Sequence, residues 1–143
     1  MQIWELAARE HIRETIARYA HLVDRGRLDE VVALFAEDAV LEAGEEPPAR
    51  GRAAIRAIFT ETGARLAAGG RPHIRHHVSN VSIALEDPEA ATAEAYFLAL
   101  TERGPDHWGR YRDRLVVRDG RWVFALRRVR VDGRSPASVL GRG

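Results

Sequence analysis

The hydrophobic pattern of this chain changes once, near His73, and that change limits the folds that the chain can adopt. Before this point apolar residues recur three or four positions apart, as in Ile12, Ile16, Tyr19 and Val23, which is the spacing of one helical face. After it, apolar and polar residues alternate, which is typical of strands. Helices followed by a run of antiparallel strands predict an α+β domain.

Turn-forming residues divide the chain into three helices and five strands. We expect a helix that ends at Gly26, a helix over about 28–37, a strand over 39–43, a helix over 52–68, and strands over 73–86, 90–102, 108–118 and 121–131. Asp119-Gly120 is the clearest turn, because this dipeptide suits a two-residue hairpin. The elements predict one domain over residues 1–132 and a loose tail over 133–143.

The composition excludes several classes of chemistry. The 143 residues include no cysteine, and all 22 basic residues are arginine. The chain therefore offers no thiolate nucleophile, no disulfide and no Schiff-base lysine. No apolar run approaches the ~18 residues that span a bilayer, and the first residues lack the build of a signal peptide. We therefore expect a cytoplasmic protein that does not contact a membrane.

The second half of the chain is the more basic one, with ten arginines between Arg103 and Arg134. The formal net charge of the whole chain is nevertheless only +1. Several of these arginines alternate on one strand face, as solvated residues do. This balance predicts no nucleic-acid partner, and strong salt-dependent binding to DNA would contradict that prediction.

The last predicted hairpin carries polar residues on its core face. Counting outward from a two-residue turn at Asp119-Gly120 pairs Tyr111 with Arg128 on this face, and Asp113 lies beside them. A buried arginine without a partner is costly. This end of the hairpin is therefore either an internal ion pair or the polar end of a ligand cavity. A slip of one residue would place Arg127 there instead.

The strand expected after His73 has an unusual distribution of polar residues. His76 and Asn80 share one face, whereas His77 lies on the other. The apolar residues change sides near Ser79-Asn80, which predicts a bulge or a strand covered on both faces. Inward His and Asn side chains indicate a polar pocket, and the alternative is a solvated strand. His73 and His76 fall on opposite faces, so we expect no metal site.

Asp24 lies at the end of the first predicted helix, beside a line of small residues formed by Ala17 and Ala20. A carboxylate at a helix C-terminus interacts unfavourably with the helix dipole. Its presence there indicates either a solvated helix end or another use for the side chain.

Four segments in this order carry a resemblance to a known family: RYAHLVDRGRLDEVVALFAEDAVLE, GRAAIRAIF, RHHVSN and YRDRLVVRDGRWVFALRRVRVD. Together they resemble the SnoaL-like branch of the NTF2-like superfamily, which includes polyketide cyclases, scytalone dehydratase and a dehydrochlorinase. The resemblance extends over about residues 5–132. It implies a cone in which three N-terminal helices pack on a curved antiparallel sheet around an internal cavity.

The resemblance also implies a site. In lyase-type members an Asp that ends the first helix pairs with a His on the first long strand, and these positions correspond to Asp24 and His76. It implies substrate-binding roles for Tyr19, Asn80 and Arg128, or Arg127 if the register slips, and the same chemistry could use Tyr111. The sequence departs from the family in lacking a pocket lysine and in having a second histidine, His77, beside the first.

The chemistry implied by this site is acid–base catalysis without a cofactor on an apolar, oxygenated small molecule. Neutral His76 would take a proton, and Asp24 would hold the imidazole in one tautomer. A dehydratase or other lyase, an isomerase and a cyclase all need such a base and a carboxylate that orients it. The alternatives are a non-catalytic module of the same fold that binds a small molecule or a protein partner, and a scaffold similar to a dioxygenase small subunit. Apolar residues on the outer sheet face predict a homodimer formed through the sheet.

Overall fold

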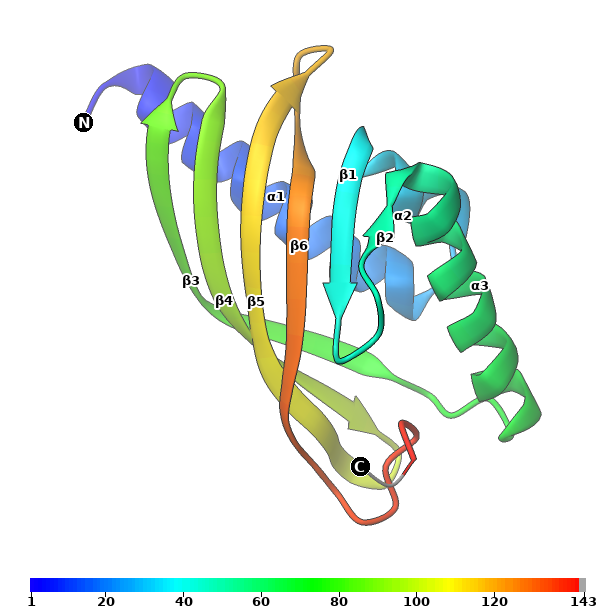
Figure 1. Ribbon diagram of the computed structural model, residues 1–143. Coiled ribbons are helices and arrows are strands. Elements are labelled where there is room, and N and C mark those ends of the chain that lie inside the picture. The colour runs from blue at the N-terminus through cyan, green and yellow to red at the C-terminus, as the bar shows by residue number, and fades with distance from the viewer. Residues whose placement is uncertain (142–143) are drawn as a thin grey trace.

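The computed structural model describes residues 1–141 (Figure 1). As the hydrophobic pattern predicts, the helices lie in the first half of the chain and the long strands from residue 75 onward follow them. The helices are α1 (Ile3–Asp24), α2 (Leu28–Ala33) and α3 (Gly51–Ala68). The strands are β1 (Phe35–Ala43), β2 (Ala49–Arg50), β3 (Arg75–Asp87), β4 (Ala90–Thr101), β5 (Gly104–Arg118) and β6 (Arg121–Arg134). None of the helices in this part of the chain is long and apolar enough to span a membrane.

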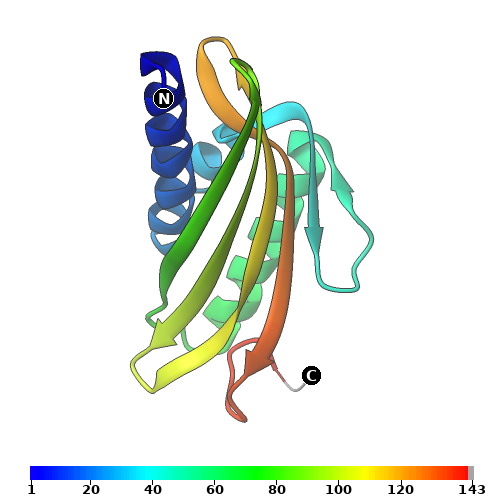
Figure 2. The same ribbon diagram turned by 90° about the vertical axis from the view of Figure 1, so that its left-hand side faces the viewer.

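The six strands form one sheet in the order β2-β1-β6-β5-β4-β3. Neighbouring strands are antiparallel except β1 and β6, which pair in parallel. The long strands bend along their length, so the sheet is strongly curved and does not close, and α1 lies on its concave side (Figure 2). The predicted α+β class and curved sheet are confirmed.

The second helix is shorter than predicted, because β1 begins where that helix was expected to continue. Phe35 and Ala36 are both almost fully buried, so the chain here has no solvent-facing side for a helix to present. Phe35 pairs with Phe124 of β6, and the backbone N–H of Phe124 donates to the carbonyl of Leu34 at 2.8 Å. These contacts with β6 end α2 at Ala33.

A bulge interrupts β3 between Ser79 and Ser82, at the place where the apolar residues change sides. Asn80 adopts a φ of 55° there. Asparagine tolerates this left-handed conformation better than most residues. Of the two predicted alternatives, a bulge and a strand covered on both faces, the structure shows the bulge, which leaves Asn80 exposed to solvent.

The register predicted for the last hairpin is correct near the turn and wrong beyond it. Leu115 pairs with Phe124 as predicted, but the ladder then shifts by one residue, and Asp113 pairs with Arg127. The extra residue, Ala125, forms a bulge in β6. As a result Arg127 is fully buried, whereas Arg128 lies on the exposed side and contacts Glu42 at 2.8 Å.

The core lies between α1 and the concave side of the sheet. Ile12 and Ile16 of α1 are almost fully buried, as are Phe35 and Phe124 opposite them. Thr15 joins the two layers, because its hydroxyl donates to the carbonyl of Trp122 at 2.9 Å. The core thus fixes the position of α1 against β6, and with it the position of the residues at the end of the helix.

The C-terminal residues are held more firmly than a loose tail would be. β6 continues to Arg134, past the domain boundary expected at residue 132. Residues 135–139 then turn back toward β5, and Ser138 is buried. The hydroxyl of Ser138 donates to Asp106 at 2.7 Å.

Candidate active site

Asp24 and His76 contact each other at the junction of α1 and β3. The Nδ1 atom of His76 lies 2.6 Å from Oδ1 of Asp24, and the backbone N–H of His76 donates to Oδ2 at 2.9 Å. The Asp24 side chain is 7% exposed and that of His76 is 16% exposed. A carboxylate at Nδ1 holds the neutral imidazole with its hydrogen on that atom, which leaves Nε2 with a free lone pair.

The local sequence explains why Asp24 lies there. Gly26, at a φ of 67°, ends α1, and the N–H of Arg27 turns back to the carbonyl of Leu22 at 3.0 Å. At the other end of the helix, Arg9 donates to the carbonyl of Ile83 on β3 at 2.8 Å. The helix is thus attached to β3 at both ends, which explains how residues 52 positions apart in the chain meet.

A second histidine, which the sequence analysis missed, lies beside the first. The ring centroid of His107 on β5 is 5.9 Å from that of His76, at an angle of 75°. Its Nδ1 lies 2.7 Å from Oδ2 of Asp106. Strict alternation would put Asp106 and His107 on opposite faces, but the register shifts here and both are buried. Only the adjacent Asp and His in the sequence could have indicated this pair.

Burial changes the protonation of the second histidine. Desolvation lowers the pKa of His107, the hydrogen bond to Asp106 opposes this effect, and the nearby His76 adds to it. The net result is a pKa below the ordinary value for histidine, so His107 is neutral at pH 7.

A buried ion pair lies farther along the concave side. Nε of Arg127 is 3.2 Å from Oδ1 of Asp113, and both side chains are 0% exposed. The guanidinium carbon lies 3.6 Å from the ring centroid of Tyr111 and 4.1 Å from that of Tyr19. Burial raises the pKa of Asp113 to about 6, although the positive charge of Arg127 opposes this rise.

The ring of Phe97 lies between the two histidines and the residues around the buried ion pair. Phe97 stacks on Tyr111 with ring centroids 4.7 Å apart, and its centroid lies 6.0 Å from that of His107 and 6.3 Å from that of His76. Burial is also the main cause that raises the pKa of Tyr19 and of Tyr111. Both phenols therefore keep their hydrogen at neutral pH and can donate it.

The structure does not bring every predicted site residue to this place. Asp24, His76, Tyr19 and Tyr111 lie on the concave side with the residues just described. Asn80 is exposed at the bulge, and Arg128 is exposed beside Glu42, so neither lies at the site. His77 is exposed on the opposite face of β3 from His76. The shift in β6 makes Arg127 the buried arginine, which is the alternative that the sequence left open.

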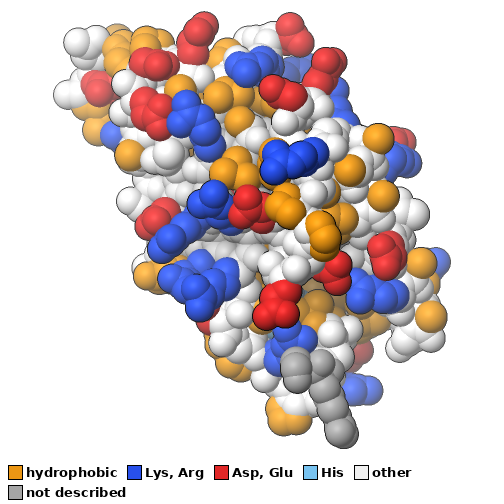
Figure 3. All heavy atoms as spheres, viewed as in Figure 1, with side chains coloured by type: hydrophobic (Ala, Val, Ile, Leu, Met, Phe, Trp, Pro, Cys, Tyr) orange, Lys and Arg blue, Asp and Glu red, His pale blue; other side chains and the backbone are white. Residues whose placement is uncertain are grey.

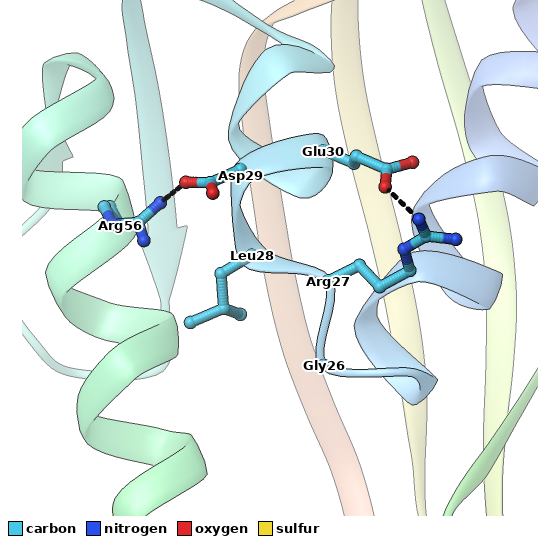
Figure 4. A pocket seen from close by; sticks show the side chains of 6 residues that line it. All are labelled: Gly26, Arg27, Leu28, Asp29, Glu30 and Arg56. Carbon is cyan, nitrogen blue, oxygen red and sulfur yellow. Dashed lines mark hydrogen bonds and ion pairs between the residues drawn. The ribbon is translucent and has the colours of Figure 1, made fainter.

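Two hollows of about 360 Å³ each lie elsewhere on the surface. One is lined by Gly26, Arg27, Leu28, Asp29, Glu30 and Arg56 (Figure 4). Its charges are already matched, because Arg27 contacts Glu30 at 2.7 Å and Arg56 contacts Asp29. Neither hollow is lined by Asp24 or His76, so the internal cavity stays a prediction. Among residues 1–141, no three His, Asp or Glu side chains gather in an arrangement that could hold a metal ion.

Comparison with known proteins gives a family and several related structures. Residues 4–128 match the family model of the SnoaL-like domain. No curated protein sequence matches the chain. A candidate scytalone dehydratase from Novosphingobium aromaticivorans is 25% identical with a TM-score of 0.82, over 100% of this chain and 99% of that one.

Two further structures from this comparison add information about fold and ligand. An NTF2-like protein with a cystatin-like fold, also from Novosphingobium aromaticivorans, is 26% identical with a TM-score of 0.76, over 99% of this chain and 98% of that one. A protein from Catenulispora acidiphila in complex with S-DNPA is 29% identical with a TM-score of 0.77, over 89% of this chain and 95% of that one.

Proposed function

Since the chain belongs to the SnoaL-like domain family, we propose that it is an acid–base enzyme that acts without a cofactor on a neutral, oxygenated small molecule. The observation that carries this proposal is the double contact of Asp24 with His76, at 2.6 Å to the ring and 2.9 Å to the backbone. A carboxylate used only to end a helix would not need to fix an imidazole in this way.

The proposed reaction begins with a proton transfer. Nε2 of His76 takes a proton from a carbon next to a carbonyl group, and the electrons of the C–H bond form an enolate. Asp24 stabilises the imidazolium that results. The imidazolium then returns the proton to another atom of the substrate or to a leaving oxygen. Elimination, isomerisation and ring closure share the first step and differ in the last one.

The surroundings favour a neutral and largely apolar substrate. The rings of Phe97 and Tyr111 lie between His76 and the buried ion pair. The charge of Arg127 is balanced by Asp113, so this arginine exerts little net attraction on an anion. The likeness to a candidate scytalone dehydratase and to a protein solved in complex with S-DNPA supports an enzymatic or binding role.

The second candidate is a binding module of the same fold that does no chemistry. It is favoured by the contact of Asp24 with the backbone N–H of His76, because this contact also serves to hold α1 against β3. Fold alone does not separate a catalyst from a binding protein. The two functions differ in one measurable respect, because only the enzyme exchanges a carbon-bound proton.

Proton exchange therefore provides the test. We would incubate the protein in D₂O with 1-tetralone and related bicyclic ketones and follow loss of the α-proton by NMR. The expected result is exchange above the buffer rate, reduced about 10²- to 10⁴-fold by Asp24→Asn and by His76→Gln. Asp38→Asn and His77→Gln change exposed residues of β1 and β3 and should leave the rate unchanged. Saturable ketone binding without exchange would favour the binding module.

We also propose that two copies pair through the outer face of the sheet. Figure 3 views this face and shows basic and acidic side chains interspersed with apolar ones. Tyr96 and Trp108 on this face are 55% and 41% exposed, which is unusual for large aromatic residues. Light scattering at micromolar concentration should give the mass of a dimer, and the mass of a monomer would contradict the proposal.

A further inference from the structure

The carboxylate beside His107 is held from two sides. Oδ2 of Asp106 contacts Nδ1 of His107 at 2.7 Å and accepts the hydroxyl of Ser138, also at 2.7 Å. Oδ1 of Asp106 accepts the backbone N–H of Val139 at 3.1 Å. The backbone N–H of Ser135 donates to the carbonyl of Asp106 at 2.8 Å. The C-terminal turn, residues 135–139, therefore fixes the position of Asp106.

These contacts decide which nitrogen of His107 carries the hydrogen. Burial raises the pKa of Asp106, but the hydrogen bonds from His107, Ser138 and Val139 lower it below its ordinary value. The carboxylate is therefore ionised at neutral pH and can only accept hydrogen bonds. Nδ1 of His107 must be the protonated nitrogen. Nε2 of the neutral ring can then only accept a hydrogen bond.

The second ring is close enough to His76 to respond to its charge. The groups that face His107 are Asp106 on its own strand, His76 on β3 and Arg134 on β6. Desolvation is the largest cause that lowers the pKa of His107, Asp106 raises it, and positive charge on His76 or on Arg134 lowers it further. Because like charges disfavour each other in a buried place, a proton on His76 opposes a proton on His107. When His76 is charged during turnover, its neighbour therefore stays neutral.

We propose that the C-terminal turn positions His107 as a neutral hydrogen-bond acceptor of the Asp24–His76 site, and that the site therefore takes a substrate with a hydroxyl group. This inference rests on the proposed function. A hydroxyl can donate to Nε2 of His107, whereas a carbonyl oxygen in the same place would meet a lone pair. Asp106 and Ser138 are positioning residues, because they act through His107.

The test is long-range ¹H–¹⁵N NMR of the histidine side chains of the ¹⁵N-labelled full chain, followed across pH. In the wild type, His107 should be in the Nδ1–H form and titrate below the ordinary value. Ser138→Ala removes one donor from Asp106, so the carboxylate holds the His107 hydrogen more strongly. The titration midpoint of His107 should rise by about 0.5 pH units. His76→Gln should raise it as well, because a glutamine cannot take up the proton that opposes a proton on His107.

The control is Ser82→Ala, which changes an exposed serine of β3 and should leave His107 unaffected. An Nε2–H form in the wild type, or an unchanged His107 midpoint in Ser138→Ala, would overturn the positioning role. Titrating the wild type with phenol and with its methyl ether should shift the His107 signals with phenol only, and any other outcome would overturn the hydroxyl preference. These readouts need no turnover, so failed ketone exchange with a normal His107 titration would count against the proposed enzyme alone.

Discussion

Two carboxylates on the concave side of the sheet contact a histidine and an arginine, and they differ in how completely they are hydrogen-bonded. Both oxygens of Asp24 accept hydrogen bonds from His76, and that ring keeps 16% of its surface exposed. Asp113 and Arg127 are both 0% exposed, and neither oxygen of Asp113 has a hydrogen bond from the residues described. The first pair can exchange a proton with a ligand or solvent. The second is enclosed, so burial alone does not identify the reactive group.

The largest expected effect is on stability, from breaking the enclosed pair. Arg127→Met leaves the charge of Asp113 buried without its partner, so at pH 8 the free energy of unfolding should fall by about 3–5 kcal/mol. Urea denaturation measures this loss. The double change Asp113→Leu with Arg127→Leu should recover most of it, because it removes both charges. A single change that costs less than about 1 kcal/mol would show that the pair is not enclosed in solution.

The second effect is a pH dependence that belongs to Asp113. Its pKa is raised to about 6 from 3.8, so the folded protein binds more protons than the unfolded chain between these values. Its contribution to the free energy of unfolding therefore falls as pH rises from about 4 to 6, by about 3 kcal/mol. Subtracting the profile of Asp113→Asn from that of the wild type isolates this term. A flat difference between pH 4 and 7 would contradict it.

The smallest effect is expected outside the site. Arg128 lies next to Arg127 in the chain, but its side chain is 56% exposed in its contact with Glu42. Exposed ion pairs contribute little, so Arg128→Ala should change the free energy of unfolding by less than about 1 kcal/mol. The same urea titration provides the measurement. A loss as large as that of Arg127→Met would mean that the bulge in β6 is misplaced and Arg128 is the inner residue.

The fold followed from the sequence more readily than the site did. The change of period near His73 and the turn at Asp119-Gly120 predicted the helices, the strands and the last hairpin near its turn. The inward position of His76 followed from alternation, and its partnership with Asp24 came from family resemblance. These inferences needed only local periodicity and one alignment of motifs.

The features that could not be predicted all depend on bulges or on contacts between distant segments. Ala125 bulges where β1 pairs with β6 at Phe124, and nothing near Ala125 in the sequence indicates a partner about 90 residues away. The shift in β5 turns Asp106 and His107 to the same side, against alternation. The role of Ser138 depends on that same shift, because Asp106 must face inward to receive its hydroxyl.

The bulge in β6 also has a consequence for how such a chain could diverge. Loss of the single residue Ala125 would leave a regular ladder in which Arg127 still pairs with Asp113 and stays on the inner face. If Ala125 instead paired with Arg114, the residues that follow it on β6 would exchange sides, and Arg128 would take the inner position. Loss of the bulge with every residue retained would therefore rebuild one wall of the interior without a single substitution. The β6 strands of relatives should therefore be compared by the direction of their side chains rather than by residue position in a sequence alignment.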